Sequence, residues 1–188
     1  MTIHVARVPM PRCAFEQIHV ALYGYFPQSA RDAERPFVWR VGEGGKAIYL
    51  ASALRPTTPS MEATIEAGRS YEFSLTYKRV RNCKSKPIEI VAMPEMRERL
   101  IKWAADRGGD VGFVRLENPR AIHAQKHQKR VRLPIVDAYG SVFVRDAEAF
   151  ERALVDGGPG TGKVYGLGMW WLDAIYAPLL QPDWRAAS

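Results

Sequence analysis

The chain has 188 residues, 47% of them hydrophobic and 25% charged, so it can bury the core of one large or two small domains. Only two cysteines occur, Cys13 and Cys83, without a paired spacing, which excludes a small disulfide-held protein and indicates reduced intracellular thiols. The net charge is +7, and residues 78–132 hold 15 Lys and Arg against six Asp and Glu. One stretch therefore makes the whole protein basic, which favours a polyanionic partner.

The sequence shows no pattern typical of secretion or of a membrane helix. The apolar run in residues 1–13 is interrupted by His4, Arg7 and two prolines. The most apolar stretch, residues 165–180, contains glycines, an aspartate and a proline, and it is shorter than the roughly 20 apolar residues of a membrane helix. We therefore expect a soluble, cytoplasmic protein that does not contact membranes.

The first half of the chain has the spacings of alternating strands and helices. Apolar residues between Phe15 and Phe26 recur every three or four positions and stop at Pro27, which is typical of a helix. The expected elements are a strand at 2–8, a helix at 15–26, strands at 37–41 and 47–52, a short helix at 61–67 and a strand at 71–77. This β-α-β-β-α-β order is that of a ferredoxin-like domain.

The second half predicts a similar order. Pro94 opens a helix that ends at Gly108, and Asp146 can cap a helix that ends at Gly157. The expected strands lie at 78–82, 111–116, 131–136, 139–144 and 164–172, and a basic segment at 120–132 connects two of them. The predicted fold class is α+β, with two tandem ferredoxin-like (βαββαβ) domains, at 1–76 and 77–188, and a glycine-rich loop before the last strand.

Residues 157–163, with the sequence GGPGTGK, nearly match the Walker A pattern that binds nucleotide phosphates. Val164 stands where that pattern needs a Ser or Thr for magnesium, and the loop follows a helix instead of a strand, so a P-loop NTPase is a remote alternative. The backbone N–H groups of Gly160 and Gly162, together with the charge of Lys163, can instead hold an RNA phosphate. A plain turn between helix and strand is the other interpretation.

Two groups of basic side chains near strand edges indicate a nucleic-acid surface, because their density is high and confined to one part of the chain. The candidate RNA-binding cations are Lys78, Arg79, Arg81, Lys84, Lys86, Arg120, Lys126, Lys129, Arg130 and Arg132. An ordinary solvated face is the alternative. His123 and His127 stand four residues apart, but no cysteine or carboxylate supports a metal site there, so we expect neither a metal nor a cofactor.

His19 is the best candidate for acid or base catalysis. It falls at the border of the apolar face formed by Phe15, Ile18 and Leu22, where a partly exposed imidazole can exchange protons near neutral pH. A histidine at such a border is more often an ordinary structural residue, so its spacing alone does not assign a role.

The segment Glu16–Val41, EQIHVALYGYFPQSARDAERPFVWRV, resembles the CasE family of CRISPR repeat-processing endoribonucleases, in the RAMP superfamily. The agreement continues along nearly the whole chain: His19 precedes a Phe26-Pro27 helix end, an Arg79-Val80-Arg81-Asn82 strand follows, and residues 157–168 give the glycine-rich loop GGPGTGKVYGLG. The resemblance implies two ferredoxin-like domains, with the catalytic histidine in the first and the basic RNA-binding residues in the second.

The resemblance also implies metal-independent cleavage of CRISPR repeat RNA at the 3′ base of its hairpin. The 2′-hydroxyl would attack the adjacent phosphate and leave a 2′,3′-cyclic phosphate and a 5′-hydroxyl. His19 would be the general acid or base, and Lys163 would offset the charge that develops on the phosphate. The family usually has a tyrosine where this chain has Glu16, so Tyr23 can take its place, or Glu16 can orient the imidazole.

The implied partners are the repeat stem-loop and the other Cas subunits of a type I-E Cascade effector complex, which acts in antiviral defence. The aromatic tail, residues 170–184, is a candidate for docking a neighbouring subunit. A non-catalytic RNA-binding subunit of such a complex is the alternative function.

Overall fold

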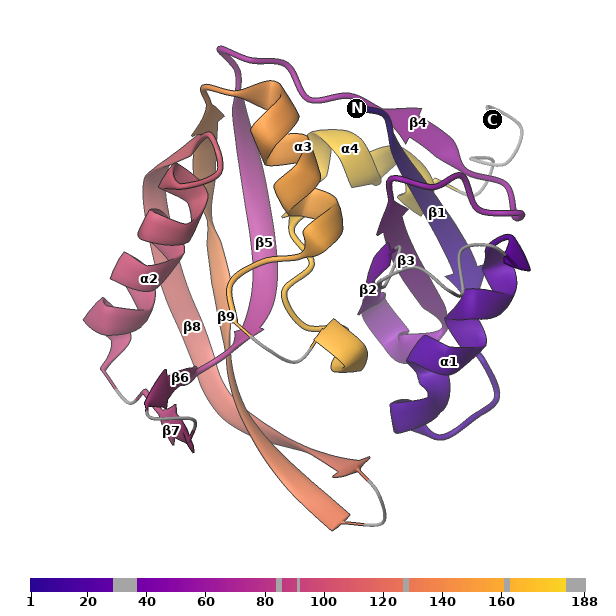
Figure 1. Cartoon of the computed structure of the whole chain (residues 1–188), viewed down its shortest axis with the longest axis horizontal. Coiled ribbons are helices and arrows are strands. Elements are labelled where there is room, and N and C mark those ends of the chain that lie inside the picture. Colours follow the sequence, from indigo (N-terminus) through magenta and orange to yellow (C-terminus); the bar gives the residue numbers. More distant parts are fainter. Residues whose placement is uncertain (29–36, 84–85, 91, 127–128, 161–162, 182–188) are drawn as a thin grey trace.

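The computed structural model describes residues 1–28, 37–83, 86–90, 92–126, 129–160 and 163–181. Two four-stranded antiparallel sheets lie side by side, with helices packed against them (Figure 1). The predicted α+β class with two tandem units is confirmed. No helix within the described ranges is long and apolar enough to span a bilayer.

The first sheet has the strand order β2-β3-β1-β4. Its strands are β1 (Ile3–Pro9), β2 (Phe37–Val41), β3 (Ala47–Ser52) and β4 (Met61–Ala63). Helix α1 (Ile18–Leu22), continued by the 3-10 turns η1 (Phe15–Gln17) and η2 (Tyr23–Tyr25), lies between β1 and β2 in the chain and packs on one face of this sheet. The predicted first helix and the hairpin of β2 and β3 are therefore confirmed.

The predicted helix at 61–67 is wrong. Residues 61–63 pair with β1 as an edge strand, with Met61 opposite Val5 and Ala63 opposite Ile3. Apolar and polar residues alternate through this segment, and Ile65 is buried while its neighbours are exposed. A period of two places apolar side chains on one face of a strand, whereas the helix would have spread them around its axis.

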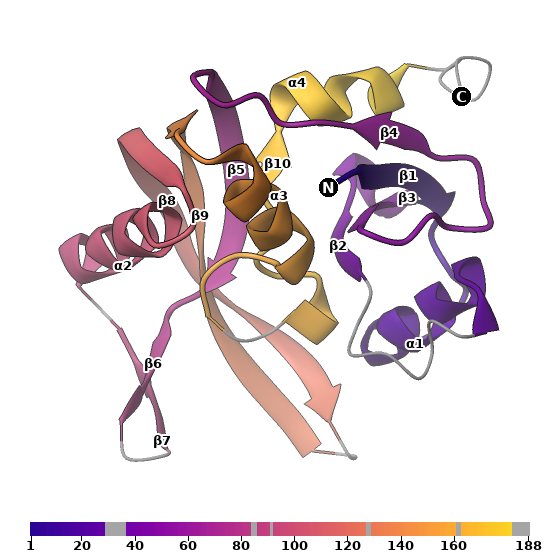
Figure 2. The same ribbon diagram turned by 45° about the horizontal axis from the view of Figure 1, so that its top comes forward.

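The second sheet has the order β10-β5-β9-β8, and two helices cover one of its faces (Figure 1). Its elements are β5 (Ser70–Lys78), α2 (Met93–Ala105), β8 (Gly109–Lys126), β9 (Lys129–Val144), α3 (Ala147–Asp156) and β10 (Trp171–Leu172). A small hairpin of β6 (Val80–Cys83) and β7 (Lys86–Glu89) extends beyond the end of β5 (Figure 2). The remaining short elements are η4 (Glu43–Gly45), η5 (Lys163–Tyr165), α4 (Asp173–Tyr176) and η6 (Ala177–Leu180).

Strand β5 belongs to the second sheet, whereas the sequence predicts a strand at 71–77 that completes the first. It pairs with β9 along its whole length, from Ser70 opposite Phe143 to Lys78 opposite Ile135. The alternation of its apolar residues shows that one face is buried, but not which elements bury it. The chain therefore passes from one sheet to the other between β4 and β5, ahead of the predicted boundary at 76–77.

Strands β8 and β9 form one long ladder in place of the shorter strands predicted at 111–116, 131–136 and 139–144. The basic segment 120–132 is not a connection, because it makes up the far half of this ladder. The register shifts between Glu117 and Arg120, and this irregularity accommodates Pro119, which has no N–H to donate to a neighbouring strand.

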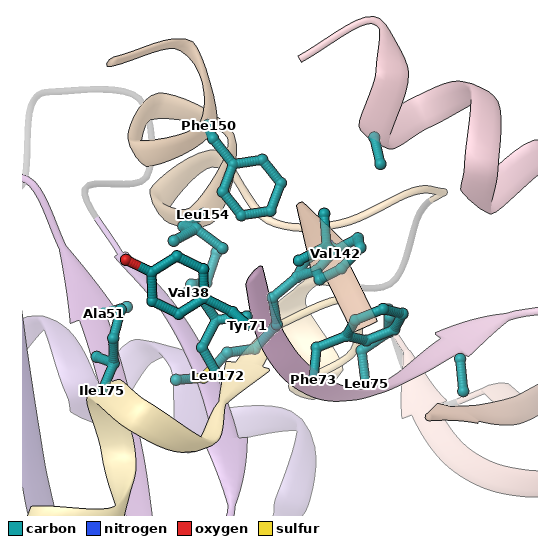
Figure 3. Packing of buried hydrophobic residues seen from close by; sticks show 14 of the residues in the cluster. Val38, Ala51, Tyr71, Phe73, Leu75, Val142, Phe150, Leu154, Leu172 and Ile175 are labelled. Atoms are coloured by element: carbon teal, nitrogen blue, oxygen red, sulfur yellow. The ribbon is translucent and has the colours of Figure 1, made fainter. Parts of the chain in front are cut away.

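One hydrophobic core joins the two sheets. Figure 3 shows Phe150 and Leu154 of α3 beside Tyr71 of β5 and Val38 of β2, so residues of both sheets pack on the same helix. On its other face the first sheet packs against Ile18 of α1 and the apolar residues that follow it. Because the first sheet is buried on both faces, α1 has a fixed position relative to the second sheet.

Candidate active site

His19 lies on α1, which is held against the first sheet by the buried side chains of Ile18 and Leu22. The histidine is half-buried, and its Nδ1 is buried without a hydrogen-bond partner in the described part of the chain. A buried polar atom without a partner costs about 1 to 3 kcal/mol, so it needs a reason to persist. An imidazole kept for chemistry is such a reason.

Glu16 on η1 and Tyr23 at the start of η2 flank His19 at the spacing of one helical turn, and both are half-buried. The ring of Tyr23 packs edge-on against Phe37, with 5.1 Å between ring centroids. Neither side chain is hydrogen-bonded to His19 within the described structure. Whether Tyr23 or Glu16 acts with His19 stays a prediction.

The glycine-rich segment, residues 157–168, reaches α1 through η5. The ring of Tyr165 stacks on Phe15 of η1 at 6.4 Å between centroids, and Phe15 meets Trp39 of the first sheet edge-on at 6.1 Å. In Figure 1 this turn, drawn in yellow-orange, lies between α1 and the β8–β9 ladder, and η5 contacts both η1 and α1. Two segments far apart in the sequence thus meet beside the helix that carries His19.

Close backbone contacts keep the glycine-rich segment in place. The N–H of Gly158 donates to the carbonyl of Gly168, and the N–H of Gly168 donates to the carbonyl of Thr76 on β5 at 2.8 Å. Gly166 has φ +70°, and a Cβ there would lie 2.8 Å from Cζ3 of Trp39, so only glycine fits.

The predicted last strand at 164–172 is too long. Residues 163–165 form η5, and within the described residues Trp171 and Leu172 pair with β5.

The predicted phosphate-binding residues of this segment differ in their surroundings. Gly160 is exposed, and a Cβ there would lie 3.7 Å from the carbonyl oxygen of Lys78, at ordinary contact distance. The ammonium of Lys163 donates a hydrogen bond to the carbonyl of Asp156, in the last turn of α3, where a cation is favoured by the helix dipole. Gly162 lies outside the described residues. The phosphate contacts of Gly160 and Lys163 therefore stay predictions.

The predicted cations near β6 and β7 are partly used in ion pairs. Arg79 is buried and pairs with Glu89 at 2.8 Å, and the same carboxylate binds Arg132 at 2.6 Å. Glu89 thus attaches the small hairpin to Arg132 of the ladder, and the backbone N–H of Arg79 donates to the carbonyl of Pro134. The side chains of Arg81, Lys86, Lys126 and Lys129, and all of Lys84, lie outside the described residues.

The two faces of the far ladder carry different groups. Leu133 and Ile135 pack with Leu167 of the glycine-rich segment. Because side chains alternate along a strand, Arg130 and Arg132 point to the opposite face. Arg120 lies directly opposite Ile135 and shares its face, next to the glycine-rich segment. Of these three predicted RNA contacts, Arg120 alone is on the face that meets the glycine-rich segment.

Sequence reasoning did not find two residues that shape this site, Tyr165 and Asp137. The sequence predicts Tyr165 as part of a strand, whereas its stacking on Phe15 depends on the turn η5. Asp137 pairs with Arg120 across the ladder. A charged residue inside the apolar run from Leu133 to Val144 was the one available signal.

Other features do not compete with this site. A hollow of about 610 Å³ between the sheets is lined by Arg40, Tyr139 and Trp171, but the carboxylates of Glu72 and Asp173 also line it, which disfavours a phosphate. No group of three or more His, Cys, Asp or Glu that could hold a metal ion is found in the described part of the chain.

A family model described as CRISPR associated protein matches residues 13–173. The chain belongs to this family of CRISPR-associated proteins. No curated protein sequence matches it at a significant level.

The CRISPR-associated protein shares its fold with several solved structures. Cse3 of Thermus thermophilus, bound to an RNA representing a pre-cleavage complex, has a TM-score of 0.77 and 14% identity over 92% of this chain and 99% of its own. Cas6e of Escherichia coli K-12 has a TM-score of 0.67 and 18% identity over 92% and 98% of the two chains. A chain of a CRISPR RNA-guided surveillance complex has a TM-score of 0.65 and 14% identity over 92% and 98%. These matches confirm the predicted resemblance and fold.

Proposed function

We propose that this CRISPR-associated protein is a metal-independent endoribonuclease that binds the stem-loop of a CRISPR repeat RNA and cleaves at the 3′ base of the hairpin. The observation that carries the proposal is the contact between η5 of the glycine-rich segment and the helix of His19. This contact brings a backbone suited to phosphate next to a side chain suited to proton transfer.

In the proposed reaction the ribose 2′-oxygen bonds to the adjacent phosphorus, and the bond from phosphorus to the 5′-oxygen breaks. The products are a 2′,3′-cyclic phosphate and a 5′-hydroxyl. His19 accepts the proton of the 2′-hydroxyl or, as an imidazolium, gives one to the departing 5′-oxygen, and Tyr23 or Glu16 assists it. Lys163 and the N–H groups of Gly160 and Gly162 bind the phosphate and offset its developing charge.

The proposed partners follow from the same fold. Cse3 has been solved with bound RNA, and another structure of this fold is part of a surveillance complex. We infer that this protein acts in the cytoplasm, retains its product and serves as a subunit of a Cascade-like effector complex. Arg81, Lys84, Lys86, Lys126, Lys129, Arg130 and Arg132 are the proposed additional contacts to the RNA backbone.

The direct test uses two hairpin RNAs that differ in a single 2′-hydroxyl. The unmodified repeat hairpin should be cut in EDTA as fast as without it, and the RNA with a 2′-deoxy nucleotide at the cleavage site should be bound but not cut. Products are identified by the 3′-end chemistry of the upstream fragment. Strict dependence on magnesium, or cleavage of the deoxy RNA, would contradict the mechanism.

A non-catalytic RNA-binding subunit is the second candidate. The observation that favours it is the basic stretch at 78–132, which holds 15 Lys and Arg against six Asp and Glu and can bind RNA phosphates without a catalytic group. In that case the protein binds the repeat hairpin tightly and leaves the unmodified RNA intact.

Gly166 offers a test of the contact on which the proposal rests. Gly166→Ala should slow cleavage at least about tenfold, because the new methyl group collides with Trp39 and moves η5 away from α1. Gly68→Ala is the matched control, since Gly68 also has a positive φ, +80°, but open space around it. Cleavage rates of the two folded variants are compared, and equal rates would show that the position of η5 does not matter.

A further inference from the structure

We propose that Asp137 is a positioning residue that holds Arg120 ready to bind one phosphate of the RNA, an inference that rests on the proposed function. Asp137 stands on β9, and its side chain is only 11% exposed, whereas that of Arg120 on β8 is 45% exposed. A shielded carboxylate beneath a half-exposed guanidinium is the arrangement that directs an arginine toward a ligand.

The carboxylate of Asp137 is fully engaged. Its Oδ1 accepts from Thr76 Oγ1 at 2.7 Å and from Arg120 Nη2 at 3.2 Å. Its Oδ2 accepts from Arg120 Nη1 at 2.5 Å and from Asn118 Nδ2 at 3.3 Å. Burial raises the pKa of Asp137, but the hydrogen bonds from Arg120, Thr76 and Asn118 outweigh it, so the pKa lies below its usual value. The carboxylate stays charged and keeps its hold on Arg120.

The irregularity in the ladder is what brings Arg120 over Asp137. The register shifts between Glu117 and Arg120, and Asn118 adopts a left-handed backbone with φ +49°. The carbonyl of Asn118 accepts from Arg120 Nη1 at 3.0 Å, so the same bend supplies a second anchor for the guanidinium. A bulge commonly serves to redirect a side chain in this way.

One edge of the guanidinium remains available. A guanidinium has five N–H groups, and Nη1 and Nη2 of Arg120 use three of them on Asp137 and Asn118. The N–H of Nε and the second N–H of Nη2 lie on the adjacent edge and have no partner in the described part of the chain. Two parallel N–H groups on one edge match two oxygens of a phosphate.

This edge belongs to the proposed site. Arg120 shares a face with Ile135, which packs on Leu167 of the glycine-rich segment. Thr76 joins the two parts, because its hydroxyl donates to Asp137 while its carbonyl accepts from Gly168. The phosphate site on Arg120 and the glycine-rich backbone are therefore held in one rigid arrangement and would contact neighbouring stretches of the same RNA.

The test separates positioning from charge. Asp137→Asn removes a negative charge near the RNA, so a purely electrostatic role predicts tighter binding, whereas a positioning role predicts weaker binding. We expect Asp137→Asn to weaken binding of the 2′-deoxy repeat hairpin about three- to tenfold, and Arg120→Ala about tenfold. Affinity decreases with salt, and the steepness of log affinity against log salt should be smaller by about 0.7 to 0.9 in each variant, the value for one lost phosphate contact.

Glu117→Gln is the matched control, because Glu117 lies opposite Asp137 on the same face and pairs with Arg115 instead of Arg120. It should leave binding unchanged or slightly tighter. Adding Asp137→Asn to Arg120→Ala should have no further effect on binding, and urea unfolding reports whether each variant is folded.

Three outcomes would overturn the inference. Binding by Asp137→Asn as tight as that of the unaltered protein, or tighter, removes the positioning role. A full additional loss in the double variant shows that Asp137 does not act through Arg120. Failure of the unaltered protein to bind the hairpin overturns the proposed function as well, so the two failures are distinguishable.

Discussion

His19→Ala is expected to reduce the rate of repeat-RNA cleavage about 10²- to 10⁴-fold, the usual contribution of a general acid or base. Binding of the hairpin should change by less than about twofold, because the cations and the glycine-rich backbone that are proposed to hold phosphates remain. The free energy of unfolding should not fall, since Nδ1 of His19 has no partner to lose within the described structure and the cost of burying it is removed. Single-turnover cleavage and direct binding are measured on the same RNA.

Val20→Ala is the matched control for this variant, because Val20 is the next residue of α1 and is 61% exposed. It should cleave at the rate of the unaltered protein. Unimpaired cleavage by His19→Ala would show that His19 is not the general acid or base. Tyr23 and Glu16 would then be the remaining candidates for that role. A loss of binding equal to the loss of cleavage would instead indicate an RNA contact.

Phe150→Ala should lower the free energy of unfolding by about 3 to 5 kcal/mol, as truncation of a fully buried aromatic ring does. The ring lies edge-on to Trp170 at 5.8 Å between centroids and fills the space beside Gly109 and Val142. The cavity would open where α3 meets both sheets. Urea denaturation, followed by tryptophan fluorescence and by circular dichroism, measures the loss.

Glu148→Ala serves as the control on the same helix, because the side chain of Glu148 is exposed and forms a surface ion pair with Arg152. Its effect should stay within about 0.5 kcal/mol. Both optical probes should show a single transition for Phe150→Ala, since the two sheets share this core. Two separate transitions would show that the two sheets unfold independently, and a loss below about 1 kcal/mol would contradict the role of Phe150.

Local signals in the sequence were sufficient to predict features that depend on neighbouring residues within one element, such as helix caps and tight turns. Asp146 caps α3 as predicted, with its side chain accepting from the N–H of Ala149 at 3.0 Å. Pro94 lies in the first turn of α2, and the hairpin of β2 and β3 follows its glycine-rich turn. The sequence did not predict structure that depends on a distant partner. Residues 61–63 form strand β4 because they pair with the edge of β1. Strand β5 joins the second sheet because its apolar face packs against the helices of that unit.

The same distinction between local and long-range features applies to the candidate site. His19 could be selected from its position on an amphipathic helix and from the family resemblance, because both are properties of one segment. The ion pair between Arg120 and Asp137 could not be predicted from the sequence. It joins two strands of the ladder and depends on a register shift that no local pattern reveals. Charge density also could not separate Arg79, which is buried against Glu89, from cations that remain exposed.

The meeting of η5 with α1 has a consequence for synthesis of the protein. Residue 19 is translated early, whereas the turn at 163–165 that packs beside it is translated after the whole β8–β9 ladder. A nascent chain on the ribosome therefore displays its histidine without the glycine-rich segment that is proposed to bind phosphate. In the proposed mechanism, cleavage needs η5 to have emerged and packed beside α1, so unfinished copies are not expected to cut cellular transcripts.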